Sequence, residues 1–186
     1  MLGFAFCGSF CTHQTAVKQL EKLIDAGYEI CPIFSDKVYS TDTRFGSAWD
    51  LRDRVESLCK RKVIHTIEEA EPLGPKQVLD ALLICPCTGN TLAKMAHGIT
   101  DTPVCMAAKA HLRCDRPLVI ALASNDALSA NLSNLAALLQ KKSVYFVPMR
   151  QDDPEGKPHS LVADFSLLVP TLEGAMTGKQ LRKLFL

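Results

Sequence analysis

The chain has 186 residues, of which 47% are hydrophobic and 22% are charged, and its net charge is only +1. This composition suits a globular protein that buries about 70% of its unfolded surface, and it lacks the basic excess of most nucleic-acid-binding proteins. No apolar run approaches the ~18 residues of a membrane span, and no basic region opens the chain, so we expect a cytoplasmic protein without signal peptide or anchor.

The chain begins with a short apolar segment that we expect to form a strand, Gly3–Cys7. The tight turn Gly8–Ser9 follows, and then a helix whose apolar residues recur at helical spacing until Gly27. A strand, a small-residue turn and a helix in this order are typical of the first crossover in an open α/β sheet.

The next elements repeat this alternation. Tyr28–Phe34 is the expected second strand, and the loop Ser35–Gly46 follows it. The helix Ala48–Lys60 then presents an apolar face to the core, and Val63–His65 is the expected short third strand.

The segment from Asp80 to His97 carries the strongest local signal. Asp80–Cys85 is nearly all apolar and too short for a helix, so we expect a fourth strand that is covered on both faces. This strand breaks at Pro86, the polar residues Thr88–Thr91 form a loop, and Leu92–His97 continue as a helix.

Strands and helices continue to alternate toward the C-terminus. In chain order we expect a strand around Val104–Met106, a helix to Arg113, a strand Leu118–Ala123, a helix Leu128–Gln140, a last strand Val144–Val147, a polar loop Pro148–His159 and a terminal helical segment. Without an internal repeat or a linker, the alternation predicts one domain over residues 1–186. Its fold class is α/β, with three layers around a doubly wound, mainly parallel sheet.

Two polar loops are expected to meet at one edge of this sheet. In a doubly wound sheet a ligand lies beyond the carboxyl ends of the strands where the strand order reverses, here between the first and the fourth strand. Gly8 and Ser9 would then face the loop that holds Thr88, Gly89, Asn90 and Thr91. Because a helix N-terminus attracts phosphate, we expect a mononucleotide or an inorganic anion there. The alternative for the second loop is an ordinary helix cap.

The eight cysteines contain no C-x-x-C pair. Without a secretory signal we expect free thiols that act mostly as small hydrophobic residues, and we expect no metal site. Cys7, Cys11 and Cys87 all lie at or just beyond strand ends, so we expect them to gather near the proposed ligand.

Several segments resemble known flavin-binding families. Pro86–Pro103 is similar to the P-A-S-A-N-T-x-x-K-x-A-x-G-x-x-D segment of the flavin-containing cysteine decarboxylases, and Met106–Leu122 is similar to a stretch of the flavin prenyltransferases. Ala123–Asn125, with Asn131 and Asn134–Leu135 downstream, resembles the second decarboxylase motif. The resemblance implies a Rossmann-like flavoprotein fold that holds FMN. The implied cofactor residues are Gly8, Ser9, Ser35, Thr88, Gly89, Asn90, Thr91, Asp101, Ala123, Ser124 and Asn125.

One part of the decarboxylase pattern is missing. Those enzymes carry a catalytic His upstream of their P-A-S-A-N-T motif, and this chain has Glu71–Leu73 in that neighbourhood. Neither His65 nor His97 is at the matching place. We therefore expect no decarboxylation of cysteinyl substrates, and the catalytic residues stay unassigned.

A narrower resemblance involves Ser40–Gly46, Glu71–Lys76 and Val147–Asp164. These segments look like the B subunits of two-subunit enzymes that form a pyridine dicarboxylate in endospore-forming bacteria. The resemblance implies a small-molecule dicarboxylate substrate and a partner, the A subunit, that binds NAD(P). It leaves two hypotheses open, because this chain can be a catalytic flavoprotein subunit or a non-catalytic companion of the A subunit.

Arg44 is the candidate that would clamp a substrate carboxylate, because a guanidinium pairs with a carboxylate in two hydrogen bonds. The alternative is an ion pair with Asp42 or Asp50. The resemblance also implies a homo-oligomer, a trimer or a multiple of one. Trp49 and Tyr39 border the Arg44 loop and could reach a neighbouring copy of the chain, although Trp49 could instead anchor its helix in the core. We expect the A subunit to dock on the loop Arg150–His159.

Overall fold

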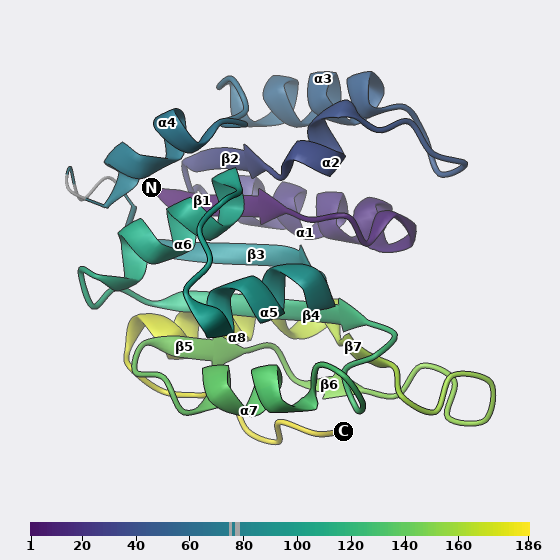
Figure 1. Ribbon diagram of the computed structural model, residues 1–186. Helices are drawn as coiled ribbons and strands as arrows, with labels where there is room; N and C mark the ends of the chain where they lie inside the picture. Colours follow the sequence, from purple (N-terminus) through teal and green to yellow (C-terminus); the bar gives the residue numbers. More distant parts are fainter. Residues whose placement is uncertain (75, 77–78) are drawn as a thin grey trace.

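The computed structural model describes residues 1–74, 76 and 79–186, so Pro75 of the Glu71–Lys76 segment lies outside the described residues. A central sheet is covered by helices on both faces, with α5, α6 and α7 on one side and α1 and α8 on the other (Figure 1). The strands are β1 (Leu2–Phe6), β2 (Ile30–Phe34), β3 (Ala81–Cys87), β4 (Leu118–Ser124), β5 (Val144–Phe146), β6 (Met149–Arg150) and β7 (Leu161–Ala163). The α-helices are α1 (His13–Asp25), α2 (Asp36–Ser40), α3 (Ala48–Cys59), α4 (Ile67–Ala70), α5 (Gly89–His97), α6 (Pro103–Leu112), α7 (Leu132–Leu139) and α8 (Leu168–Met176), and the short 3-10 helices are η1 (Phe10–Thr12), η2 (Glu71–Leu73) and η3 (Phe165–Leu167).

Within the described part of the chain the sheet has seven strands, in the order β2-β1-β3-β4-β7-β6, and β5 also pairs with β4. The pairs from β2 to β5 are all parallel. Strand β4 changes partner along its length, because Leu118–Ile120 pair with β5 whereas Ala123 and Ser124 pair with the antiparallel strand β7. The predicted three-layer, doubly wound, mainly parallel sheet is therefore confirmed.

Side chains of successive strand residues enter two different cores, as the two-residue period of a strand requires. Phe4 and Phe6 of β1 pack with α1 and α8, whereas Ala5 faces the cluster that contains α5, α6 and α7. The side chains of both cores are almost fully buried. Burial of each large apolar side chain stabilises the folded state by roughly 1.5–3 kcal/mol. No helix within the described ranges is long and apolar enough to cross a membrane.

Two predicted strands are wrong. Val104–Met106 lies inside α6, because Thr102 caps this helix through the Cys105 N–H and Pro103 occupies its first turn. Val63–His65 forms no strand, and only Ile64 makes an isolated parallel bridge to Ile33 of β2. The strand counted as fourth in the sequence is consequently β3.

Other boundaries also differ from expectation. The loop Ser35–Gly46 contains α2, which Ser35 caps. Strand β3 does not break at Pro86 but runs on to Cys87 with a register shift after Ile84. Val144–Phe146 is not the last strand, since the β6–β7 pair follows it.

Trp49 is 60% exposed and so does not anchor α3 in the core. Tyr39 behaves differently, because its ring stacks on His65 with centroids 3.8 Å apart, lies 4.8 Å from the guanidinium of Arg52 and packs against the core. Of the two aromatic residues next to the Arg44 loop, Trp49 is therefore the one that stays available to a neighbouring molecule.

Candidate flavin and substrate site

A cavity of about 650 Å³ opens beyond the carboxyl ends of β1, β3 and β4, and we call it the main cavity. Its size lies within the range of about 300–1,000 Å³ that is usual for small-molecule sites. The main cavity is lined by Gly8, Ser9, Phe10, Cys11, Thr12, Arg44, Phe45, Thr88, Gly89, Asn90, Ala123, Ser124, Asn125, Asp126, Asp152, Lys157, Ser160 and Val162.

The two loops that were expected to converge are in direct contact. The backbone N–H of Cys7 donates to the carbonyl oxygen of Pro86 at 3.2 Å, and the Thr91 hydroxyl donates to the Cys7 sulfur at 3.3 Å. This contact joins the ends of β1 and β3, so the predicted meeting of the first and second polar loops is confirmed.

The start of α5 forms one wall of the main cavity. Thr88 is the N-cap of α5, and its hydroxyl accepts the N–H of Thr91 at 3.3 Å. The N–H groups of Gly89 and Asn90 belong to the first turn, where a helix offers no backbone acceptor. A capped helix start of this kind favours an anionic group through its N–H donors and its dipole. The two interpretations of this loop, an ordinary helix cap and an anion site, are therefore compatible.

Gly89 is held against the loop that follows β4. A Cβ atom at Gly89 would lie 2.5 Å from the Ser124 hydroxyl oxygen and 2.6 Å from the Asn131 side-chain nitrogen. Both of these groups donate to the carboxylate of Asp126, at 2.5 Å and 2.9 Å. Asp126 was missed in the sequence, although its place two residues after the end of β4 was an available signal.

Three predicted cofactor residues do not line the main cavity. Ser35 caps α2, with its hydroxyl oxygen 3.5 Å from the N–H of Val38. Asp101 forms an ion pair with Lys94 at 2.7 Å. The Thr91 side chain is buried between Thr88 and Cys7 and so supports the loop from behind.

Arg44 does line the main cavity, from an exposed loop. Its guanidinium lies 4.9 Å from the ring centroid of Phe45 and forms no ion pair with a carboxylate of the described residues. The alternative partner Asp42 is engaged elsewhere, since it accepts the N–H of Ala48 at 2.8 Å and thereby supports the start of α3. Arg44 is therefore available to an anionic ligand.

The segment after β6 contributes residues that the sequence did not indicate as ligand contacts. Lys157 and Asp152 form an ion pair at 2.9 Å and both line the main cavity. They belong to the loop expected to dock the A subunit, which extends beyond the strand ends on the same side as the loop around Arg44 (Figure 1). Pairing of β7 with the end of β4 brings this loop to the main cavity, and a local sequence pattern does not reveal that pairing.

The three cysteines near the site differ in exposure. Cys7 and Cys87 are fully buried, and burial raises the pKa of the Cys7 thiol to about 12 and that of Cys87 well above its usual value. Both thiols are therefore protonated and unreactive at neutral pH. Cys11, by contrast, is exposed and lines the main cavity.

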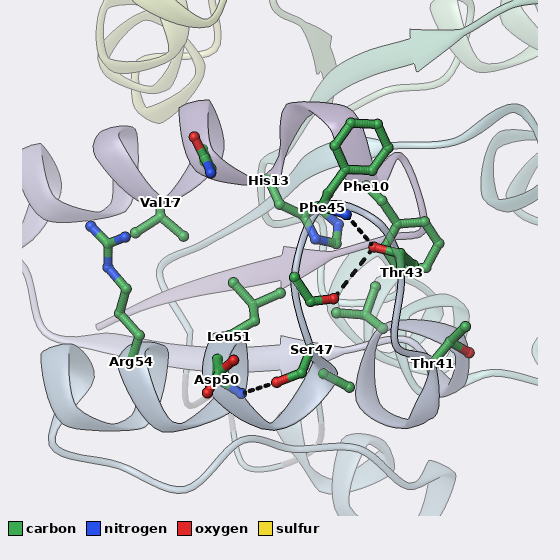
Figure 2. Close-up of a pocket in the computed structure, with 14 residues that line it drawn as sticks. Phe10, His13, Val17, Thr41, Thr43, Phe45, Ser47, Asp50, Leu51 and Arg54 are labelled. Atoms are coloured by element: carbon green, nitrogen blue, oxygen red, sulfur yellow. Dashed lines mark hydrogen bonds between the residues drawn. The ribbon is translucent and has the colours of Figure 1, made fainter.

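A second pocket of about 160 Å³, the side pocket, lies between α1, α2, α3 and the loop that joins α2 to α3 (Figure 2). It shares Phe10 and Phe45 with the main cavity. His13, on the first turn of α1, lines the side pocket, and its Nε2 donates to the carbonyl oxygen of Cys7 at 2.8 Å. His13 was missed in the sequence because nothing in the helical pattern distinguishes it.

The model of the Flavoprotein family matches residues 4–163 of this chain. The dipicolinate synthase B subunit of Bacillus subtilis (strain 168) is 44% identical over 181 residues, which cover 97% of this chain and 90% of that protein. The crystal structure of the dipicolinate synthase B subunit from Bacillus halodurans C has a TM-score of 0.91 at 38% identity and covers 100% of this chain and 95% of that one. The FMN-dependent cysteine decarboxylase SpaF has the same fold, with a TM-score of 0.66 at 24% identity, covering 94% of this chain and 95% of that chain.

Proposed function

This chain belongs to the flavoprotein family, and we propose that it acts as the B subunit of a dipicolinate synthase. In this role it contributes, during sporulation, to the formation of pyridine-2,6-dicarboxylate from a hydroxy-tetrahydropyridine dicarboxylate. The proposed enzyme is an oxidoreductase in which the A subunit binds NAD(P). The observation that carries the proposal is the 44% identity over nearly the whole chain, and the helix N-terminus that lines the main cavity supports it.

We propose FMN as the ligand of the main cavity. The phosphate would lie at the first turn of α5, near Ser9, Thr88 and the N–H groups of Gly89 and Asn90. The ring system would lie beside Ala123–Asn125, at the end of β4. The cavity volume and its donor-rich floor fit such a group, and FMN supplies the capacity to accept and return two electrons.

The chain's own residues would bind and orient the dicarboxylate. Arg44 offers a guanidinium without a carboxylate partner among the described residues, at the mouth of the main cavity. Phe45, on which Arg44 stacks, forms an apolar wall between the main cavity and the side pocket. Lys157 adds a second cation, although Asp152 already balances its charge.

A second candidate function is that of a non-catalytic partner, which keeps the flavoprotein fold while the A subunit performs the oxidation. One observation favours it, because no histidine is present among the described residues that line the main cavity. A decarboxylase or prenyltransferase of the FMN-dependent type is less favoured, since the histidine of the decarboxylase pattern is missing.

A titration of the purified chain with FMN tests the cofactor proposal. We expect a shift of the flavin absorption bands and quenching of its fluorescence on binding. Asn90→Asp places a negative charge at the start of α5 and should weaken FMN binding by about five- to thirtyfold, because repulsion between this carboxylate and the phosphate should cost about 1–2 kcal/mol. Ser57→Asp, on the exposed part of α3, is the control and should leave the affinity unchanged. An unchanged flavin spectrum at millimolar FMN would contradict the assignment.

A further inference from the structure

The side pocket has the size and lining of a site for a small ring. An apolar protein cavity of about 150 Å³ holds one benzene-sized molecule, and the side pocket measures about 160 Å³. Much of its wall is apolar, and the apolar residues come from α1, α2, α3, η1 and the loop around Phe45. These residues are Phe10, Val17, Val38, Phe45, Ala48 and Leu51.

Three polar side chains that line the side pocket, those of Thr43, Ser47 and Arg54, already have protein partners. The Thr43 hydroxyl accepts the N–H of Phe45 at 3.2 Å, and the Ser47 hydroxyl accepts the N–H of Asp50 at 3.0 Å, as the dashed lines of Figure 2 indicate. Arg54 is paired with Glu21 at 2.8 Å. These three groups line the pocket, but their hydrogen bonds are made within the protein and not to a ligand.

Gln14, Thr41 and Asp50 also line the pocket, but all three residues are exposed, so His13 is the buried polar residue of the described lining. One of its two ring nitrogens has no partner among the described residues. The side chain is 8% exposed and lines the side pocket. Its Nε2 lies 2.8 Å from the carbonyl oxygen of Cys7 and must carry the proton, since a carbonyl oxygen only accepts. Burial also lowers the pKa of His13, so the ring is neutral at pH 7 and Nδ1 keeps its lone pair.

We infer that the side pocket binds a single-ring molecule that bears an N–H or O–H group, and that this group donates to Nδ1 of His13. The aromatic rings of Phe10 and Phe45 contact the ligand, while His13 selects for a donor at its edge. This binding does not depend on the proposed function, because the side pocket exists whether or not the chain binds flavin.

Pyrrole and furan form a matched pair of probes for this site. The two rings have nearly the same size, but pyrrole carries an N–H donor where furan carries an oxygen. We expect the full-length chain to bind pyrrole about two- to tenfold more tightly than furan, which is the effect of one hydrogen bond. In ¹⁵N-labelled protein, pyrrole should shift the Nδ1 resonance of His13, and furan should not. Equal affinities for the two rings, or an Nδ1 resonance that pyrrole leaves in place, overturns the inference.

Two variants test whether pyrrole and furan bind in the side pocket. Ala48→Leu fills the side pocket from the start of α3 and should abolish the binding of both rings. Lys157→Ala alters only the main cavity and should leave pyrrole binding within twofold. Undiminished binding in Ala48→Leu, or no binding of either ring to the unmodified chain at tens of millimolar, also overturns the inference. A chain that binds pyrrole but not FMN upholds this inference while the cofactor proposal fails.

Discussion

At the scale of single residues, Gly89 is the point where the start of α5 meets the loop after β4. Alanine at this position would bring a Cβ atom to 2.5 Å from the Ser124 hydroxyl and to 2.7 Å from the Asp126 carboxylate. We expect Gly89→Ala to lower the free energy of unfolding by about 1–3 kcal/mol, as overpacking of a tight contact does. Urea denaturation measures the change.

Gly8→Ala is the matched control on the opposite loop. A Cβ atom at Gly8 would meet only the Phe10 ring, at an ordinary 3.5 Å. Its effect on the free energy of unfolding should stay within about 0.5 kcal/mol, as for substitutions without a steric conflict. Equal destabilisation by the two substitutions would show that the Gly89 contact is looser than described.

Cysteine reactivity should follow exposure and pKa. Cys11 is exposed, whereas Cys7, Cys85 and Cys87 are buried and burial raises the pKa of each thiol. We expect iodoacetamide at pH 8 to modify Cys11 in the folded protein well before those three, because only the thiolate reacts. Peptide mass spectrometry measures the order, and protein unfolded in urea provides the control. Modification of Cys7 at the rate of Cys11 would contradict the burial of the β1 end.

Two buried histidines make stability depend on pH. Burial lowers the pKa of His13 and of His111, so the unfolded chain takes up protons at a higher pH than the folded one. Their contribution to stability is complete above the unfolded pKa of about 6.5 and is lost as pH falls through the lower folded values. We expect the urea midpoint to be lower at pH 5.5 than at pH 7.5. The difference should shrink in His111→Phe and persist in His97→Gln, a change at an exposed residue of α5.

At the scale of elements, caps define where several helices start. Thr66 begins α4 with a reciprocal cap, because its hydroxyl accepts the Glu69 N–H at 3.2 Å and the Glu69 carboxylate accepts the Thr66 N–H at 3.2 Å. Hydrogen bonds from the backbone of His65 and Thr66 lower the pKa of Glu69.

We expect Thr66→Ala to reduce the free energy of unfolding by about 0.5–2 kcal/mol, the usual cost of a lost N-cap. The control is Thr15→Ala on the exposed face of α1, which should change stability by less than about 0.5 kcal/mol. Thermal unfolding of both variants gives the comparison, and a loss no larger in Thr66→Ala than in the control would argue against a stabilising cap.

Local patterns predicted the strands that are buried on both faces. β1, β3 and β4 are nearly continuous apolar runs, as is typical of strands in the interior of a parallel sheet. The same reasoning failed for Val104–Met106, because a short apolar run fits a buried helix equally well and the Thr102–Pro103 start decides the outcome. It also failed for Val63–His65, where only Ile64 reaches β2.

The site was predictable only where it depends on a local pattern. Gly8, Ser9 and Thr88–Asn90 occur in strand–loop–helix sequences, and the parallel order of β1 and β3 brings them together. Lys157 and Asp152 reach the main cavity through the antiparallel pairing of β7 with β4, which depends on distant residues. His13 owes its position to tertiary packing against Phe6 and Phe10.

At the scale of the whole molecule, the exposed aromatic residues beside the main cavity favour self-association. Trp49 is 60% exposed and Phe45 is 46% exposed. Aromatic residues are enriched in protein–protein interfaces, so we expect Trp49 and Phe45 to lie in an interface of the homo-oligomer, a trimer or a multiple of one, that the family resemblance implies. Multi-angle light scattering measures its mass.

Trp49→Arg should shift the protein toward the monomer if this surface is an interface, because a buried unpaired charge opposes association. Met176→Arg, an equally drastic change on an exposed residue of α8, is the control and should leave the mass unchanged. A monomeric unmodified chain would contradict the expected assembly.

The most direct test of the proposed function is dipicolinate formation by the reconstituted enzyme. The assay supplies the hydroxy-tetrahydropyridine dicarboxylate precursor and NAD(P) and follows pyridine-2,6-dicarboxylate with this chain alone, with the A subunit by itself and with both. We expect product at a substantial rate only in the mixture, and we expect Arg44→Ala to reduce that rate by at least about tenfold if its guanidinium holds a substrate carboxylate. Full activity of the A subunit by itself, with no increase when this chain is added, would contradict the assignment of this chain as a functional part of the enzyme.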